Sequence, residues 1–260
     1  MEFTLASPYP VEGPASWQPA LSLKGAALEA LLANPQFRER VRAELAAPAT
    51  FRLFNGEWEK VHVVQVSQER HRELEQKSIA ELARRSAKDP LDVMLDLALD
   101  EDLTTIFTAQ LLNSDEEAVG RLLTHPHSPV SLSDAGAHLT FFNDAGFGLH
   151  LMGHWARDRG VMSLPEAVRR LTSQSAGIFG IADRGLLREG FAADLLLFDP
   201  ATVGRAKARR VHDLPGGAAR LHTDALGVHG VWVNGTKVAG VHGVFERAPL
   251  AGELLTRFTH

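Results

Sequence analysis

Residues 129–138 have the sequence PVSLSDAGAH, a short apolar run followed by a carboxylate, small residues and a histidine. We predict a strand over 129–134 that delivers Asp134 into a loop containing His138. Parallel α/β barrels carry their catalytic groups on the loops that follow strands, and small residues let a substrate or metal approach the backbone. A turn or helix-capping aspartate explains these ten residues equally well. The rest of the chain must therefore decide between the two interpretations.

Composition narrows the class of protein. The chain has 260 residues, of which 45% are hydrophobic and 23% charged, as is typical of a globular protein. Its net charge is −5, and alanines interrupt its densest basic run, residues 205–210, so we expect no nucleic-acid partner. It contains no cysteine, so disulfides are excluded and any metal must be held by His, Asp or Glu.

Targeting segments are not evident either. The first residues lack the basic segment and the apolar core of a secretory signal, and no apolar run has the length of a membrane span. We therefore expect a cytoplasmic protein with no membrane partner, and the lack of cysteine is compatible with a reducing compartment.

The first part of the chain predicts helices and a hairpin. Residues 24–46 are helical in composition, and Pro35 predicts that they form two short helices. Residues 51–66 predict a hairpin around Asn55-Gly56, the favoured turn dipeptide. We assign this hairpin to an insertion-like segment near residues 48–75.

The predicted secondary structure of the later part of the chain changes once, after Gly180. Helices are predicted over 77–87 and after Asp89-Pro90. Residues 103–176 then predict strand, helix, strand, loop and helix, the alternation of a parallel α/β structure. After Gly180, strands alternate with turn residues, including a hairpin at Asn234-Gly235. These patterns predict a small all-β module in the last third of the chain.

Three stretches of the chain resemble one family of enzymes. They are LLTHPHSPVSLSDAGAH (122–138), LPEAVRRLTSQSAGIFGIADRGLLREGFAADLLLFDP (164–200) and GVHGVWVNGTKV (227–238). The sequence is similar to the C-terminal half of the metal-dependent amidohydrolase superfamily, and more narrowly to the N-acyl-D-amino-acid deacylases, or D-aminoacylases. The most specific part of the resemblance is Arg184-Gly185 with GFAADL at 190–195.

The resemblance implies a fold and a metal. The fold would be α/β, with the C-terminal part of a (β/α)8 TIM-like barrel over 1–180 followed by a β-sandwich module over 181–260. The family binds one or two divalent metals, usually zinc, through a His-x-His on the first barrel strand, a bridging residue and two further histidines. An aspartate on the eighth strand lies beside the metal-bound water. This aspartate alone has a match here, Asp134, so the other ligands are expected in an N-terminal half.

By this resemblance Asp134 would be both a metal ligand and the catalytic residue. A divalent metal lowers the pKa of its bound water towards neutrality. An adjacent carboxylate accepts a proton as hydroxide attacks an amide carbonyl, and then returns it to the leaving nitrogen. His138, on the following loop, is a candidate for contact with the substrate, against a role in local hydrogen bonding.

Two other histidine pairs are weaker candidates for metal ligands. His125 and His127 form a His-x-His, but they precede the predicted eighth strand and so fall at the face of the barrel that serves stability. His150 and His154 have the i, i+4 spacing of a zinc-binding helix, but no Glu between them completes a HExxH motif. We expect a loop role for the first pair and helix packing for the second.

The substrate is an amide whose nature stays open. D-aminoacylases are expected to bind the substrate carboxylate with an arginine in the loop after the aspartate, because arginine suits bidentate recognition. Here the loop LTFFNDAGFGLH (139–150) contains no basic residue before His150, and Arg157 is the first arginine. Phe141, Phe142 and Phe147 would suit an apolar or cyclic amide, or simply pack the loop. A cyclic amidase of the hydantoinase or imidazolone type is therefore an alternative.

We expect this chain alone to bind zinc poorly and to be inactive. An incomplete barrel would expose strand edges and apolar surface, and these call for a partner or for self-association. An alternative function, different from that of an enzyme acting alone, is a non-catalytic remnant or a split subunit that needs an N-terminal partner half. The expected partners are thus a small-molecule amide substrate and either a separate N-terminal half or further copies of this chain in a homo-oligomer.

Overall fold

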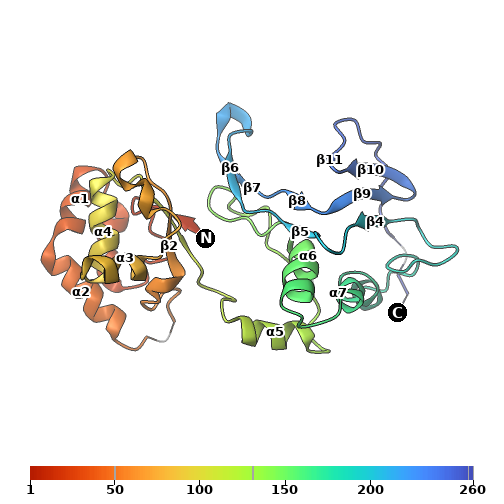
Figure 1. Cartoon of the computed structure of the whole chain (residues 1–260), viewed down its shortest axis with the longest axis horizontal. Helices are drawn as coiled ribbons and strands as arrows, with labels where there is room; N and C mark the ends of the chain where they lie inside the picture. Colours follow the sequence, from red (N-terminus) through yellow and green to blue (C-terminus); the bar gives the residue numbers. More distant parts are fainter. Residues whose placement is uncertain (50, 131, 257, 260) are drawn as a thin grey trace. The chain divides into compact units, whose positions relative to one another are not determined.

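The computed structural model describes residues 1–49, 51–130, 132–256 and 258–259. The chain forms two compact units, Met1–Ser114 and Asp115–His260. In Figure 1 the first unit runs from red to yellow and the second from green to blue. None of the helices within the described ranges combines the length and the apolar character needed to cross a membrane.

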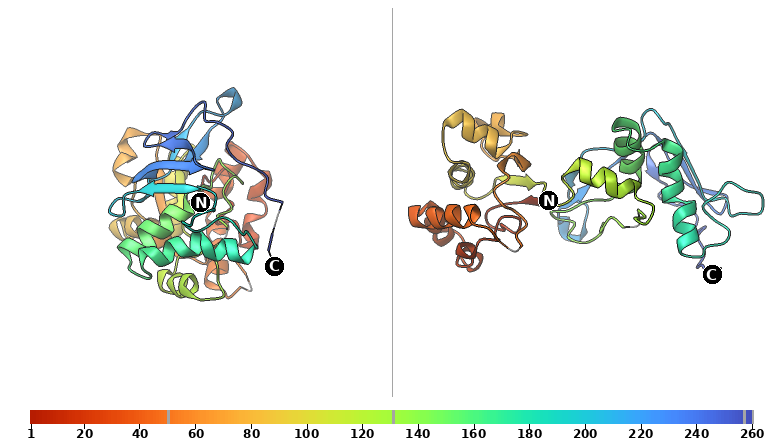
Figure 2. Two further views of the ribbon diagram at one scale, coloured as in Figure 1. Left: turned by 90° about the vertical axis from the view of Figure 1, so that its right-hand side faces the viewer. Right: turned by 90° about the horizontal axis from the view of Figure 1, so that it is seen from below.

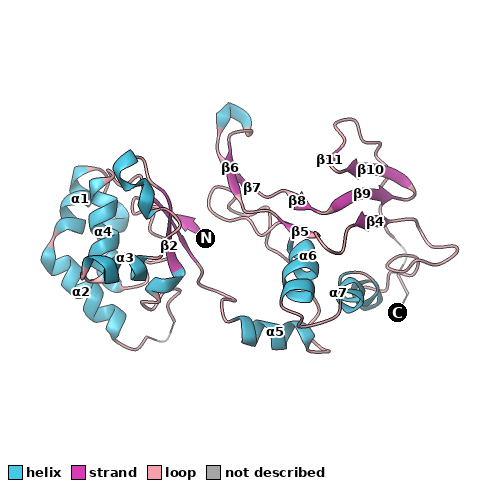
Figure 3. Cartoon of the chain, in the orientation of Figure 1, coloured by secondary structure: helices cyan, strands magenta, loops and turns pink. Residues whose placement is uncertain are grey.

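The first unit combines helices with a small sheet. Its elements are β1 (Glu2–Phe3), η1 (Ala15–Trp17), η2 (Ala20–Ser22), α1 (Ala26–Ala33), α2 (Pro35–Ala46), η3 (Trp58–Lys60), β2 (Val61–Gln65), η4 (Glu69–Leu74), α3 (Ile79–Ser86), α4 (Pro90–Asp100) and β3 (Ile106–Ala109). The sheet has the order β1-β3-β2 and both pairings are antiparallel. Figure 3 shows α1 to α4 grouped beside β2.

Local sequence signals explain the helix boundaries of this unit. The Asn34 side chain accepts hydrogen bonds from the backbone N–H groups of Gln36 and Phe37, so α2 begins at Pro35 as predicted. Asp89 does the same for Leu91 at the start of α4. These caps confirm the two predicted breaks, because each side chain satisfies an N–H group that the first helical turn leaves unpaired.

The hairpin predicted over residues 51–66 is wrong. Strand β2 forms, but it pairs with β3, with Val63 opposite Phe107. Residues 51–54 form no strand, and the Phe54 ring packs edge-on against Trp58 with centroids 4.7 Å apart. The apolar side chains of β2 are buried by a strand far away in sequence, which a local turn signal does not reveal.

The second unit contains short helices and most of the strands. Its elements are α5 (Glu116–Thr124), α6 (Phe147–His150), the π-helix η5 (Leu151–Asp158), α7 (Leu164–Leu171), α8 (Ser173–Ile178), β4 (Leu195–Phe198), β5 (Gly204–Arg205), β6 (Arg209–Val211), η6 (Pro215–Gly217), β7 (Arg220–His222), β8 (Ala225–Leu226), β9 (Val228–Val233), β10 (Thr236–Gly240) and β11 (Gly243–Val244). Figure 2 shows these elements from two further directions. The sheets are β11-β10-β9-β4, β5-β8 and β6-β7.

The hairpin predicted at Asn234-Gly235 is confirmed. It joins β9 to β10, and both turn residues have positive φ, 46° and 79°, as the favoured two-residue turn requires. The helix predicted at the end of 103–176 is also present as α7, and the Ser163 hydroxyl accepts a hydrogen bond from Glu166 N–H at its start.

The strand predicted over 129–134 is not observed. Ser131 lies outside the described residues, and the remaining residues of this stretch adopt no strand. The predicted parallel alternation over 103–176 is likewise absent, because every strand pairing seen in the described ranges is antiparallel. A barrel strand is held by hydrogen bonds from neighbours on both sides, and no described strand lies beside 129–134.

The division at residue 180 stays a prediction. The boundary between the two compact units falls between Ser114 and Asp115 in the sequence, after β3. From residue 181 onward the described residues form strands and one short 3₁₀ helix, so the predicted change of secondary structure is present.

Candidate functional site

The turn that contains Asp134 has an unusual backbone. Asp134 has φ 57°, Gly136 φ 99° and His138 φ 54°. Glycine adopts such angles freely, whereas for other residues they cost free energy. Non-glycine residues in this region cluster at functional sites, where surrounding structure enforces them. Aspartate and histidine adopt these angles more readily than most non-glycine residues, and eight non-glycine residues of the described chain have positive φ. The turn is therefore compatible with a functional role for Asp134, although no strand delivers it.

The Asp134 carboxylate is exposed and makes no recorded hydrogen bond or ion pair with the rest of the described chain. The local turn bond comes from its neighbour, since the Ser133 hydroxyl accepts a hydrogen bond of 3.1 Å from Ala135 N–H. The helix-capping interpretation of Asp134 therefore has no support. An uncommitted carboxylate can exchange protons with a ligand or contribute to a metal site.

His138 begins the loop after Asp134. Its ring stacks on Phe141 with centroids 5.0 Å apart, and its carbonyl accepts hydrogen bonds from the N–H groups of Phe141 and Phe142. The side chain is exposed. The structure brings His138 together with the two phenylalanines, so local interactions account for its position and its contact with a substrate stays a prediction.

Strands from later in the chain hold this loop. Leu221 N–H donates to the Leu139 carbonyl at 2.8 Å, and the Asn143 side chain donates to the Thr223 hydroxyl at 3.1 Å. In Figure 1 the loop lies beside β6 and β7. The loop is thus positioned by segments about 80 residues further along the chain.

Two arginines reach this loop from outside it. The Arg210 guanidinium donates to the Thr140 carbonyl at 3.0 Å, and Arg205 lies 3.7 Å from the Asp144 carboxylate. The loop sequence alone does not reveal either residue, because each lies more than 60 positions after the loop residue that it contacts. The sequence signal for both is the basic run at 205–210.

The residues present do not fit a metal centre by themselves. Within the described ranges no three His, Asp or Glu side chains come close enough to hold a metal ion. Asp134, predicted as a metal ligand, therefore belongs to no such group in the described part of the chain. A catalytic zinc needs three protein ligands, so the metal predicted from the family resemblance would require residues other than these.

The pair His125 and His127 has a local role. Their ring centroids are 5.6 Å apart, and His127 N–H donates to His125 Nδ1 at 3.2 Å. The described contacts of this pair lie within the loop itself, in line with the predicted loop role.

The pair His150 and His154 packs within its helix. The rings stack 4.7 Å apart with 5° between their planes, and His154 Nε2 lies 3.0 Å from the Glu116 carboxylate. Burial lowers the pKa of His150 to about 4, and the nearby Arg205 and His154 act in the same direction. His150 is therefore neutral at neutral pH, as expected for a packed side chain.

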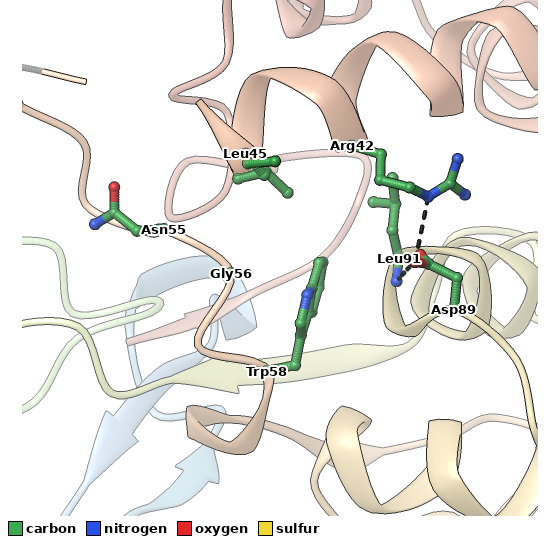
Figure 4. A pocket seen from close by; sticks show the side chains of 8 residues that line it. Arg42, Leu45, Asn55, Gly56, Trp58, Asp89 and Leu91 are labelled. Carbon is green, nitrogen blue, oxygen red and sulfur yellow. Dashed lines mark hydrogen bonds and ion pairs between the residues drawn. The ribbon is translucent and has the colours of Figure 1, made fainter. Parts of the chain in front are cut away.

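A cavity of about 250 Å³ lies in the first unit, and none of its lining residues is a predicted site residue. Figure 4 shows Trp58 on one side of it and the Arg42–Asp89 ion pair on the other. All three guanidinium nitrogens of Arg42 already pair with Glu39, Asp89 and Asp92. This cavity offers no free charged group to a ligand and is not the candidate site.

Comparisons of the sequence with known proteins identify one family. Residues 40–239 match the sequence profile of a family described as the amidohydrolase family. An N-acyl-D-aspartate deacylase from Alcaligenes xylosoxydans xylosoxydans is 30% identical over 161 residues, which make up 59% of this chain and 30% of that protein. A D-aminoacylase from the same organism is 41% identical over 90 residues, or 34% of this chain and 16% of that protein.

Solved structures of related proteins match this chain with low structural similarity. The N-acyl-D-glutamate deacylase from Bordetella bronchiseptica, complexed with zinc and a phosphonate inhibitor, is 26% identical, with a TM-score of 0.41 over 75% of this chain and 36% of that one. The chain spans less than a third of the length of either Alcaligenes relative.

Proposed function

Because the chain belongs to the amidohydrolase family, we propose that it contributes Asp134 to a metal-dependent hydrolase of amide C–N bonds that resembles the N-acyl-D-amino-acid deacylases. The observation that carries this proposal is the exposed, uncommitted carboxylate held in a left-handed turn. The finer fold assignment belongs to the same proposal, namely part of a (β/α)8 barrel followed by a β-sandwich module.

The proposed chemistry of Asp134 is proton transfer. As a water oxygen bonds to the amide carbonyl carbon, the carboxylate accepts a proton from that water. It then donates the proton to the amide nitrogen as the C–N bond breaks, which yields a carboxylic acid and a neutral amine. A positioned carboxylate acting in this way contributes about 10²–10⁴-fold to the rate.

The proposed substrate carries a free carboxylate. The named relatives deacylate N-acyl-D-aspartate and N-acyl-D-glutamate, and Arg210 brings a guanidinium to the loop that follows Asp134. Arginine binds carboxylates through parallel hydrogen bonds. This contact favours an N-acyl-D-amino acid over the neutral cyclic amide that the loop sequence alone left as an alternative.

A second candidate function is a split subunit that needs a partner half, or a non-catalytic remnant. It is favoured by the lack of three convergent metal ligands in the described part of the chain. For the hydrolase and for the split subunit, the metal, zinc in the Bordetella structure, would be held mainly by residues other than those described.

Zinc titration of the isolated chain tests this point. We expect isothermal titration with zinc chloride to give no stoichiometric binding at micromolar concentration, and a chelator to leave the melting temperature unchanged. The Asp134→Asn variant serves as a control and should behave identically. Tight one-to-one zinc binding that this substitution weakens would contradict the expectation.

Turnover tests the activity itself. Release of free amine from N-acetyl-D-leucine and N-acetyl-D-glutamate would be followed with zinc present. We expect none from the chain alone. Zinc-dependent hydrolysis by the chain alone, abolished by Asp134→Asn, would show that the chain carries a complete site and would overturn the split-site proposal.

A further inference from the structure

The sequence contains two Asn-Gly dipeptides, Asn55-Gly56 and Asn234-Gly235. Each predicts a hairpin turn, but only the second joins two paired strands in the structure. Both asparagines are exposed, and the two glycines have similar positive φ, 89° and 79°. The dipeptides therefore share their residues, their exposure and the glycine conformation, and they differ in the hydrogen bonds that hold them.

An asparagine that precedes a glycine can lose its side-chain amide without an enzyme. The glycine backbone nitrogen gives up its proton and bonds to the asparagine Cγ, while the Cγ–Nδ2 bond breaks and Nδ2 leaves as ammonia. Water then opens the cyclic imide, either at Cγ to give aspartate or at the backbone carbonyl carbon to give isoaspartate. Glycine has no Cβ that would hinder the attack. The reaction thus requires a glycine nitrogen without a hydrogen bond and an asparagine side chain that can turn towards it.

The Asn234-Gly235 turn meets neither requirement. Gly235 N–H donates a hydrogen bond of 2.9 Å to the Ala193 carbonyl. The Asn234 side chain donates to the Ala251 carbonyl at 2.8 Å, and its Oδ1 accepts a hydrogen bond from Arg184 at 2.9 Å. Strands β9 and β10 pair directly beside the turn. Attack at Asn234 therefore requires local opening of these bonds first.

The Asn55-Gly56 loop is held by fewer and longer hydrogen bonds. None of the hydrogen bonds recorded for the described residues has the Gly56 N–H as its donor. The Asn55 side chain donates to the Arg52 carbonyl at 3.4 Å and accepts from Arg52 Nε at 3.3 Å, both beyond the usual range of about 2.7–3.2 Å. Residues 51–57 form no helix or strand, and Figure 4 shows Asn55 and Gly56 in the loop that leads to Trp58. Both requirements of the reaction are met here.

We propose that Asn55 is a site of spontaneous deamidation, and that the hydrogen bonds around Asn234 protect the second dipeptide from the same reaction. Exposure does not decide between the two sites, because both asparagines are exposed. The deciding difference is the restraint on the side chain and on the glycine nitrogen.

Deamidation at Asn55 changes the surroundings of Arg52. The Arg52 guanidinium donates to carbonyls at the end of α2, those of Glu44, Leu45 and Ala47. A carboxylate at position 55 places a negative charge where Arg52 now contacts a neutral amide, and a charge-assisted hydrogen bond is stronger than a neutral one. The product therefore competes with the end of α2 for this guanidinium.

Peptide mapping by mass spectrometry measures both sites in one sample. Trypsin releases residues 53–60, which contain Asn55, and residues 221–237, which contain Asn234. Deamidation replaces NH₂ by OH and so raises the peptide mass, and electron-transfer fragmentation distinguishes isoaspartate from aspartate. The folded protein is incubated at mildly alkaline pH, which favours loss of the glycine proton. We expect deamidation at least about tenfold faster at Asn55 than at Asn234.

Two controls separate the effect of the fold from that of the local sequence. In concentrated urea both dipeptides lose their surroundings, and we expect their rates to become similar. Asn55→Gln should leave residues 53–60 unmodified, because glutamine would have to close a larger ring. Equal rates at the two asparagines in the folded protein, or no deamidation at Asn55, would overturn the proposal. A rate difference that persists in urea, or a mass increase that remains in Asn55→Gln, would do the same.

Discussion

Asp134 and His138 both have left-handed backbone angles on either side of Gly136. Each such residue costs about 1–3 kcal/mol unless the surroundings enforce it. The side chain of Asp134 does not offset this cost through a capping bond, because Ser133 makes the local one. The aspartate is therefore held in a costly conformation with its carboxylate uncommitted, as a group reserved for a ligand would be.

Glu101 is a buried carboxylate with a structural role. It accepts hydrogen bonds from Ser67 and Gln68 N–H groups, and His71 Nδ1 lies 2.5 Å from it. Burial alone would raise its pKa, but the hydrogen bonds from Ser67 and His71 outweigh burial and lower the pKa to about 2. This residue ties the segment after β2 to the end of α4.

Glu101→Gln should destabilise the first unit by about 1–3 kcal/mol at pH 6, because one buried carboxylate replaced by an amide leaves several donors poorly paired. The folded pKa lies below the ordinary value of 4.5. The contribution of the carboxylate is therefore complete above about pH 4.5 and is lost as the pH falls towards 2.

Urea unfolding at pH 6 and pH 3 measures this effect. We expect the wild type to lose about 2 kcal/mol from this group at pH 3, and Glu101→Gln to lack that loss. The control Glu69→Gln removes a carboxylate that is 80% exposed and should follow the wild type. Equal pH dependence in Glu101→Gln and the wild type would refute the assignment.

At the scale of elements, Arg184 gives a structural role to the most specific part of the family resemblance, Arg184-Gly185 with GFAADL at 190–195. Its guanidinium donates to Asp194 and Asn234 and also pairs with Glu253. It thereby joins the loop before β4 to the β9-β10 turn and to the C-terminal segment. The Arg-Gly and GFAADL residues are thus linked to the architecture of the β-rich part.

Local signals in the sequence predicted the elements whose cause is local. The helix break at Pro35, the helix start at Asp89-Pro90 and the turn Asn234-Gly235 depend on a few neighbouring residues, and each is present. The pairing of β2 with β3 and the contact of Arg210 with the loop after Asp134 join distant segments. A single sequence does not show such contacts, so the hairpin at 51–66 was wrong and Arg210 was missed.

Gly153 permits the close packing of η5 on β5. A Cβ atom at this position would lie 2.4 Å from the Val203 carbonyl oxygen, a backbone atom that cannot move away alone. We expect Gly153→Ala to destabilise the second unit by about 1–3 kcal/mol through this clash. The control is Gly148→Ala, whose Cβ would meet only the Leu171 side chain at 3.5 Å.

Thermal unfolding monitored by tryptophan fluorescence compares the two glycine variants. Trp155 lies in η5 and reports on this packing. A Gly153→Ala protein as stable as Gly148→Ala would show that η5 does not pack on β5 as described.

At the scale of the whole molecule, the two units differ in their cores. The first contains a large buried cluster that includes Trp17, Phe37, Phe107 and Leu95. The second is longer, but its buried cluster is small and consists of Leu151, Met152, Trp155, Ala156, Ala167 and Val203. Burial of apolar surface is the main stabilising contribution to folding, so the first unit should be the more stable.

Hydrogen exchange followed by mass spectrometry measures this difference. Backbone amides of α4, which packs into the first core, should exchange at least about tenfold more slowly than those of α7 in the second unit. Equal protection of the two helices would contradict the assignment of stability to the first unit.

The central claim is that Asp134 serves amide hydrolysis as part of a site completed by other residues. The most direct measurement is hydrolysis of N-acetyl-D-amino acids with zinc, using protein produced from the native genomic locus with its flanking sequence retained. We predict activity that Asp134→Asn lowers at least about 100-fold, while Asp144→Asn, a carboxylate in the same loop beside Arg205, retains it. Undiminished activity in Asp134→Asn, or none from the native locus, would contradict the account.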